Sequence, residues 1–164
     1  MKLPEKHLKH GDIIAIRRDR WLSKAIATWT SSHWSHVGLV VRYGDEWFII
    51  DSNEKGVDID FLERRLESVE DLTILRPKTK KYKITKAVAE LEKFCKVKTR
   101  YDLPLFISIA VKTAINVNLN LNSKGFTCTE LMALYISLLG IDHKLNKACT
   151  AQDFLEIEEL TKII

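Results

Sequence analysis

The sequence predicts a single α+β domain over residues 1–164, in which an antiparallel sheet packs against a layer of helices. The first half of the chain holds short apolar runs separated by turn residues, which is typical of strands joined by hairpins. The second half holds longer segments with apolar residues at helical spacing. With 164 residues, of which 46% are hydrophobic, the chain is large enough to bury one core without cross-links.

The predicted strands lie in the first half and are bounded by turn residues. They cover residues 13–16, 36–43, 46–52, 57–60 and 72–75. Only Gly44 and Asp45 separate the second run from the third, which predicts a hairpin with a two-residue turn. Hairpin connections join antiparallel strands, so the sheet is predicted to be antiparallel. A charged stretch, residues 61–68, is interpreted as a short helix.

The remaining predicted helices share apolar positions at a spacing of three and four residues. They cover residues 21–29, 87–95, 105–115, 128–139 and 150–155. Pro104 suits the first turn of the third, Gly140 ends the fourth, and Thr150 suits the N-cap of the last. The aromatic edge of 21–29 is expected in the core, with a lipid-binding face as the alternative. Residues 1–10 are expected to form a flexible extension.

The charge balance limits the classes of partner. The chain has 26 Lys and Arg residues against 22 Asp and Glu residues, a net charge of +4 that is spread along the sequence. This excess is too mild to predict a nucleic-acid partner, although an anionic substrate or a peripheral contact with lipid is compatible with it. The densest basic run, residues 78–83, follows Pro77 and is interpreted as a solvated linker.

Apolar runs and cysteine count predict the compartment. No apolar run reaches the ~20 residues that span a bilayer, and the first residues lack the apolar run of a secretory signal. Cys95, Cys128 and Cys149 are an odd number in a chain that needs no disulfides to fold. We therefore expect a cytoplasmic protein with at least one free thiol. The oligomeric state stays open.

Cys128 stands where a loop bounded by Gly125 gives way to an apolar helix, and His36 begins a predicted strand. A helix N-terminus stabilises thiolate over thiol, and an imidazole can hold the released proton. This pairing predicts a thiol nucleophile with its base, the alternative for Cys128 being a buried structural thiol. Cys95 lies on one helix face with apolar residues and is interpreted as a small buried hydrophobe.

Asp51 is the candidate for a third member. A turn at residues 44 and 45 places His36 opposite Asn53 and puts Asp51 diagonally across on the same face. A carboxylate there would orient the imidazole and stabilise the imidazolium. Asn53 and Glu54 are rival candidates. Gly38 leaves room beside His36, and we expect that face of the sheet to look towards Cys128.

Several motifs carry a resemblance to a known family. In chain order they are Gly11-Asp12-Ile13-Ile14, Ser35-His36-Val37-Gly38, Tyr101-Asp102, Phe126-Thr127-Cys128-Thr129-Glu130-Leu131 and Thr150-Ala151-Gln152-Asp153-Phe154. This ordered set resembles the permuted papain-like cysteine amidases, circularly permuted relatives of the NlpC-type cell-wall peptidases, in which the histidine strand precedes the cysteine helix. The resemblance spans roughly residues 11–155.

The resemblance implies a papain-like α+β fold and a role for each site residue. It implies that Cys128 is the nucleophile, that His36 carries the proton, and that Asp51 supplies the acidic group, where the family commonly has glutamate. It also implies that Tyr101 lines the site and adds a hydroxyl to an oxyanion pocket whose other donor is the Cys128 backbone N–H, the alternative for Tyr101 being a role in packing. Thr129 and Ala151 depart from the serine and proline that the family often has, without removing a required chemical group.

The expected reaction is cleavage of an amide or related acyl bond through a thioester, with a small amide, peptide or acylated substrate. The alternatives are an acyltransferase or thioesterase acting on lipidated substrates, with an acyl groove lined by 21–29 and 103–115, and a catalytically silent binding module. No cofactor and no metal are expected, because His33 and His36 alone make too few ligands and no CxxC or HExxH pattern is present.

Overall fold

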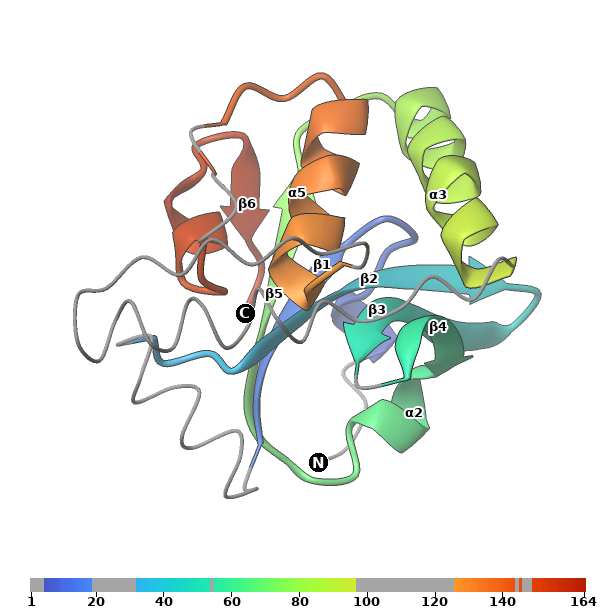
Figure 1. Ribbon diagram of the computed structural model, residues 1–164, viewed down its shortest axis with the longest axis vertical. Coiled ribbons are helices and arrows are strands. Elements are labelled where there is room, and N and C mark those ends of the chain that lie inside the picture. The colour runs from blue at the N-terminus through green and yellow to red at the C-terminus, as the bar shows by residue number, and fades with distance from the viewer. Residues whose placement is uncertain (1–4, 19–31, 54, 97–125, 144, 146–148) are drawn as a thin grey trace.

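The computed structural model describes residues 5–18, 32–53, 55–96, 126–143, 145 and 149–164 (Figure 1). Among these residues, six strands form one sheet in the order β4-β3-β2-β1-β5-β6. The strands are β1 (Ile13–Arg18), β2 (His36–Tyr43), β3 (Glu46–Asn53), β4 (Gly56–Phe61), β5 (Val69–Pro77) and β6 (Leu160–Lys162). Every neighbouring pair is antiparallel, as predicted.

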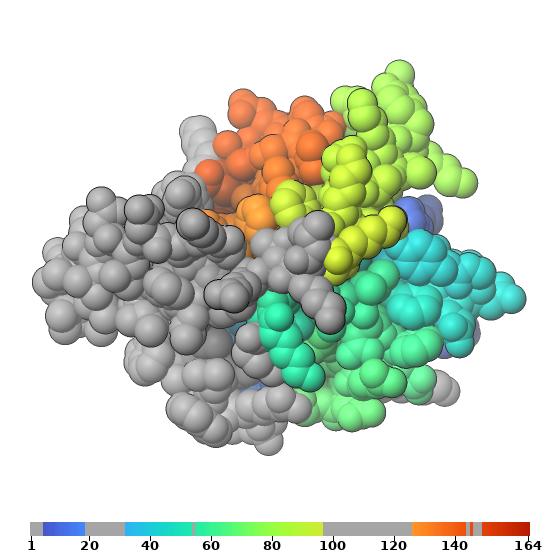
Figure 2. Space-filling model, turned by 45° about the vertical axis from the view of Figure 1, so that its right-hand side comes forward, coloured from blue at the N-terminus to red at the C-terminus, as the bar shows by residue number. Residues whose placement is uncertain are grey.

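The described helices divide between the two faces of the sheet. They are α2 (Leu62–Arg65), α3 (Lys81–Lys96) and α5 (Cys128–Leu138), with short 3-10 helices at Glu5–His7 and Asp153–Glu156. Helices α3 and α5 lie side by side over one face, whereas α2 lies near the end of β4 (Figures 1 and 2). This arrangement is the α+β class that the sequence predicted. None of the described helices is both long and apolar enough to cross a bilayer.

The larger core fills the space between the sheet and the pair of helices α3 and α5. Alternate strand positions supply its sheet side, including Ile13, Leu39 and Ile50, and α5 supplies Leu131 and Tyr135. The Tyr135 hydroxyl donates a hydrogen bond to the Gly11 carbonyl oxygen at 2.9 Å, which satisfies a polar atom inside this core. The body of α5 is therefore held by apolar burial and by one buried hydrogen bond.

A smaller apolar cluster covers the opposite face. Its sheet side includes Ile14, Val40 and Ile49, and Leu62 of α2 packs on them. Leu8 also belongs to this cluster, with 6% of its surface exposed. The expectation that residues 1–10 form a flexible extension is therefore wrong for residues 5–10, because burial of Leu8 ties this segment to the sheet.

The β2–β3 hairpin has the predicted register. Its pairs run from Tyr43 opposite Glu46 to Leu39 opposite Ile50, and Gly44 in the turn has a φ of 60°, which favours glycine. The pairing with β3 ends at Leu39, three residues after His36, the first residue of β2. At the start of β2, which pairs with β1 on one side, backbone groups on the other side are therefore available to another partner.

Other predictions differ in detail. Strand β5 is longer than the predicted 72–75, and β6 was not predicted at all. Thr150 does not cap the closing helix, which is a 3-10 turn from Asp153; instead the Asp153 carboxylate accepts a hydrogen bond from the Thr150 N–H at 2.6 Å. The predicted helices 21–29 and 105–115 lie outside the described residues.

Candidate active site

Thr127 and Glu130 build the N-terminus of α5. The Thr127 side chain accepts a hydrogen bond from the Glu130 N–H at 3.2 Å, and the Glu130 carboxylate accepts one from the Thr127 N–H at 2.9 Å. This reciprocal pair is a capping box, which makes Cys128 the first residue of the helix. Glu130 thus has a structural role at the start of this helix. The thiol stands at the positive end of the helix dipole.

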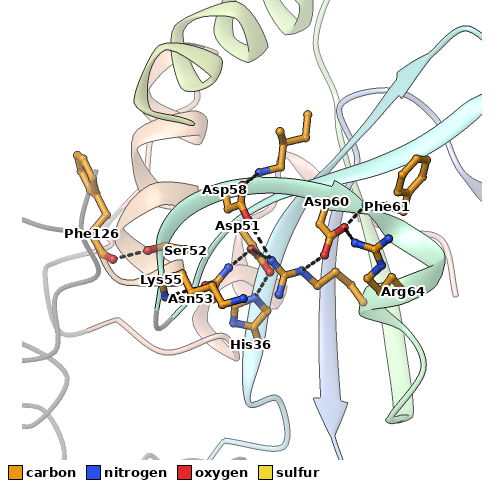
Figure 3. A network of polar contacts seen from close by, with 12 residues as sticks. His36, Asp51, Ser52, Asn53, Lys55, Asp58, Asp60, Phe61, Arg64 and Phe126 are labelled. Carbon is orange, nitrogen blue, oxygen red and sulfur yellow. Dashed lines mark hydrogen bonds and ion pairs between the residues drawn. The ribbon is translucent and has the colours of Figure 1, made fainter. Parts of the chain in front are cut away.

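The start of α5 lies against the ends of β2 and β3. The Val37 N–H donates a hydrogen bond to the Cys128 sulfur, at the part of β2 that no longer pairs with β3. The Ser52 hydroxyl donates to the Phe126 carbonyl oxygen at 2.5 Å (Figure 3). These two contacts place Cys128 where the hairpin opens, and there the thiol meets the His36 ring through a hydrogen bond.

His36 and Asp51 form a hydrogen-bonded pair. The Nε2 atom of His36 lies 2.8 Å from Oδ2 of Asp51, so the ring nitrogen left for Cys128 is Nδ1 (Figure 3). Asp51 is completely buried, and 13% of the His36 side chain is exposed. The diagonal placement predicted from the register therefore brings the two side chains into contact.

The expectation that this face of the sheet looks towards Cys128 is wrong. His36 and Asp51 alternate with the positions under α5 and share a face with Val40 and Ile49. Helix α5 packs on the other face. The thiol and the imidazole meet because His36 is the first residue of β2, so the contact is made at the end of the strand rather than across the sheet.

Two neighbours hold the Asp51 carboxylate from its other side. Asn53 donates a hydrogen bond to Oδ1 through Nδ2 at 3.1 Å, and Nη2 of Arg65 lies 3.4 Å from the same oxygen. Of the two described candidates for a third member, Asp51 therefore contacts His36, whereas Asn53 contacts Asp51. Glu54 lies outside the described residues.

Gly38 leaves space for side chains of the neighbouring strand β3. It lies directly across from Asp51 in the extended register, and a Cβ built on it would be 2.5 Å from Cδ1 of Ile49 and 3.3 Å from Cβ of Asp51. The first distance is far below van der Waals contact, so any larger residue would displace Ile49. The space beside Gly38 is thus taken up by Ile49 and Asp51, and room beside His36 stays a prediction.

Charge coupling at the site favours a thiolate beside an imidazolium. Burial alone would raise the pKa of the Cys128 thiol, but the His36 charge and hydrogen bonds from the His36 ring and the Val37 N–H lower it below its usual range. Burial alone would lower the pKa of His36, but the Cys128 charge and the hydrogen bond to Asp51 raise it to about 9. The His36 hydrogen bond also lowers the pKa of Asp51, against the effect of burial.

The thiol pKa values of the other two cysteines are shifted in the opposite direction, upwards. Burial raises the pKa of Cys95 to about 11, and it likewise raises the pKa of Cys149 to about 11. Both are free thiols. Cys128 is thus the one of the three whose surroundings stabilise a thiolate.

Three residues that contact the site, Thr127, Ser52 and Arg65, were not predicted from the sequence. Tyr101, which was predicted to line the site, lies outside the described residues. Thr127 carries a signal that could have been read, because a threonine three residues before a glutamate and an apolar run is the pattern of a capping box. Ser52 and Arg65 carry none, since their contacts with Phe126 and Asp51 arise only when distant segments meet.

A metal centre would need several ligand side chains grouped around one point. Within the part of the chain that the structure describes, no three His, Cys, Asp or Glu side chains are grouped closely enough to hold a metal ion. His36 already has Asp51 on one ring nitrogen and Cys128 on the other side. The described donors do not fit a metal site.

Comparisons with known proteins identify the fold and the family of this chain. One solved structure that the chain resembles is the crystal structure of metalloprotein yiiX from Escherichia coli O157:H7, with a TM-score of 0.63 and 16% sequence identity over 96% of this chain and 97% of that chain. This likeness shows the fold. A comparison with curated protein sequences finds no match. The model of the permuted papain-like amidase enzymes, the YaeF/YiiX, C92 family, matches residues 7–164, and the chain therefore belongs to that family.

Proposed function

We propose that the protein is a cysteine hydrolase that cleaves an amide or related acyl bond through a thioester on Cys128. The observation that carries this proposal is the contact of Cys128, the first residue of α5, with His36, whose other ring nitrogen is bonded to Asp51. A thiolate paired with an imidazolium supplies both the nucleophile and the acid that acyl transfer needs. Family membership supports the same class of reaction.

In the first step, the Cys128 sulfur attacks the carbonyl carbon of the substrate. The negative charge moves to the carbonyl oxygen, which backbone N–H groups at the start of α5 would stabilise by hydrogen bonds. When the tetrahedral intermediate collapses, Nδ1–H of the His36 imidazolium gives its proton to the leaving nitrogen. The C–N bond breaks, the amine departs, and an acyl thioester and a neutral imidazole remain.

In the second step, the neutral His36 takes a proton from water as the oxygen of that water attacks the thioester carbon. Collapse of the new intermediate breaks the C–S bond, releases the carboxylic acid and restores the thiolate and the imidazolium. Asp51 keeps its negative charge throughout, because its role is to accept the hydrogen bond from Nε2–H and to stabilise the charged ring.

An acyltransferase or thioesterase would share the first step and differ in the bond cleaved or in the acceptor. We propose water as the acceptor, a small amide, peptide or acylated molecule as the substrate, and no nucleic-acid partner. We also propose a cytoplasmic location, because a nucleophilic thiol must stay reduced. The segments suggested to line an acyl groove, 21–29 and 103–115, lie outside the described residues.

The first test is selective alkylation. Iodoacetamide near neutral pH is expected to modify Cys128 much faster than Cys95 or Cys149, because thiolates react and thiols with a raised pKa do not. Peptide mass analysis after short exposure measures the three rates. Equal rates at all three cysteines would support the silent module instead.

A second test identifies the acceptor. Incubation with p-nitrophenyl acetate is expected to give a mass increase of one acetyl group on Cys128, which then disappears in buffer alone. A peptide p-nitroanilide tests the amide bond in parallel. An acetyl group that persists in water and leaves only when an amine or alcohol is added would show an acyltransferase and overturn the proposal of hydrolysis.

A further inference from the structure

Arg65, the last residue of α2, lies among three carboxylates. Its Nη2 atom is 3.4 Å from Oδ1 of Asp51 and 3.9 Å from Oδ2 of Asp58, and its Nε atom is 3.6 Å from Oδ2 of Asp60. Figure 3 shows that Asp51, Asp58 and Asp60 lie close together along β3 and β4. Three negative groups thus gather behind His36 around one guanidinium.

The three carboxylates differ in exposure. The side chain of Asp51 is 1% exposed, that of Asp60 is 19% exposed and that of Asp58 is 51% exposed. Water screens the charge of Asp58 but not that of Asp51, so the interaction of Arg65 with Asp51 is the strongest of the three. Asp58 is also the residue directly across from Asp51 in the β3–β4 pairing. Without a cation, these two like charges would face each other.

Each oxygen of Asp51 has its own partners. Oδ1 faces Arg65 and Asn53, and Oδ2 faces Nε2 of His36. A carboxylate held on one oxygen by a cation and an amide presents the other oxygen in a fixed direction. The arrangement therefore couples the place of Arg65 to the orientation of the His36 ring.

We propose that Arg65 is a positioning residue for the reaction, which keeps the buried Asp51 ionised and turns its second carboxylate oxygen towards His36. The inference rests on the proposed function, because it assigns Arg65 a role in the same site. A purely structural role, in which Arg65 only ties α2 to the sheet, is the alternative. The two differ in whether the titration of Asp51 depends on the Arg65 charge.

The charged and titratable groups around Asp51 come from every element packed on it. They are His36 of β2, Arg65 of α2, Asp58 and Asp60 of β4, Cys95 of α3 and Cys128 of α5. Arg18 of β1 also approaches this group, since its Nη2 donates to the Arg65 carbonyl oxygen at 3.4 Å. The Arg65 charge lowers the pKa of Asp51, so removal of that charge raises it.

The experiment follows the Asp51 carboxyl carbon by NMR while pH is varied. Arg65→Met is expected to move the midpoint of this titration to higher pH, because the ionised carboxylate loses a neighbouring positive charge. Arg65→Lys keeps the charge, so the Asp51 midpoint is expected to stay close to that of the wild-type protein. The matched control is Arg64→Met, because Arg64 is bonded to Asp60 at 2.9 Å and carries the same charge one residue away.

A second variant, expected to shift the Asp51 midpoint in the opposite direction, is measured in case Arg65→Met does not fold. Asp58→Asn removes a half-exposed negative charge and is expected to move the Asp51 midpoint to lower pH. The acid limb of p-nitrophenyl acetate hydrolysis is measured on the same proteins and should move in the same directions, because a protonated Asp51 no longer supports the imidazolium.

The outcomes separate the two proposals. A Cys128 that does not react in the wild-type protein defeats the proposed function, and the Asp51 titration still reports the effect of Arg65. A reactive Cys128 with an Asp51 midpoint that neither Arg65→Met nor Asp58→Asn moves overturns the role of Arg65 alone. An equal shift in Arg64→Met would also overturn it, because the effect would then belong to net charge and not to this contact.

Discussion

The two faces of the sheet differ in what they bury. The face under α3 and α5 is covered mainly by apolar side chains such as Leu39, Ile50 and Leu131. The face near α2 mixes apolar residues with the charged side chains of Asp51 and Arg65. The difference indicates that apolar burial on the first face holds the fold together, and we propose that the charged groups on the second act in the chemistry. Helix α5 belongs to both, because its body packs on one face while its first residue reaches His36.

The largest expected effect comes from removing the sulfur. Cys128→Ala should lower hydrolysis of p-nitrophenyl acetate by on the order of 10⁴-fold or more, because the reaction loses its nucleophile. The free energy of unfolding should change little, since Cys128 is only half-buried. The control is Cys95→Ala, which should keep the activity. Full activity in Cys128→Ala would contradict the proposal that Cys128 is the nucleophile.

The next effect concerns the apolar face. Leu131→Ala should lower the free energy of unfolding by about 2–5 kcal/mol, because it leaves a cavity under α5 in a fully buried position. Denaturant unfolding measures the loss, and Leu138→Ala on the exposed side of the same helix is the control. Where the variant is folded, iodoacetamide should still prefer Cys128. Loss of that preference in folded protein would show that the two faces do not act separately.

The charge of His36 should determine how stability and hydrolysis change at alkaline pH. Its pKa of about 9 lies above the ordinary 6.5, so the stability that this charge contributes is complete below pH 6.5 and is lost as the pH rises through about 9. Hydrolysis should fall over the same range, because the acid that protonates the leaving group disappears. His36→Ala should abolish this alkaline limb and should raise the pH at which Cys128 reacts with iodoacetamide. An unchanged alkylation profile would mean that the two side chains do not interact.

The smallest effect concerns the cap of α5. Thr127→Ala should lower the free energy of unfolding by about 1 kcal/mol, because the Glu130 N–H loses its side-chain acceptor. Ser137→Ala, near the end of the same helix, is the control and should change stability less. Alkylation of Cys128 should slow slightly in Thr127→Ala, since the thiol depends on an ordered helix start. A stability loss as large as that of Leu131→Ala would contradict this ranking.

The sequence by itself determined the β2–β3 register, and with it the pairing of His36 with Asp51. The physical reason is that a two-residue turn and strict alternation decide which positions share a face. The helix start at Cys128 was equally visible, because a turn glycine and a capping pattern are local signals.

Tertiary structure decided what brings the thiol to the imidazole. Alternation alone puts His36 on the face away from α5, and the contact exists because the β2–β3 pairing stops at Leu39 and leaves the strand end open to Cys128. Packing also decided the place of Arg65 and the burial of Leu8. These features depend on which distant segments share a surface, and no local pattern of residues encodes that.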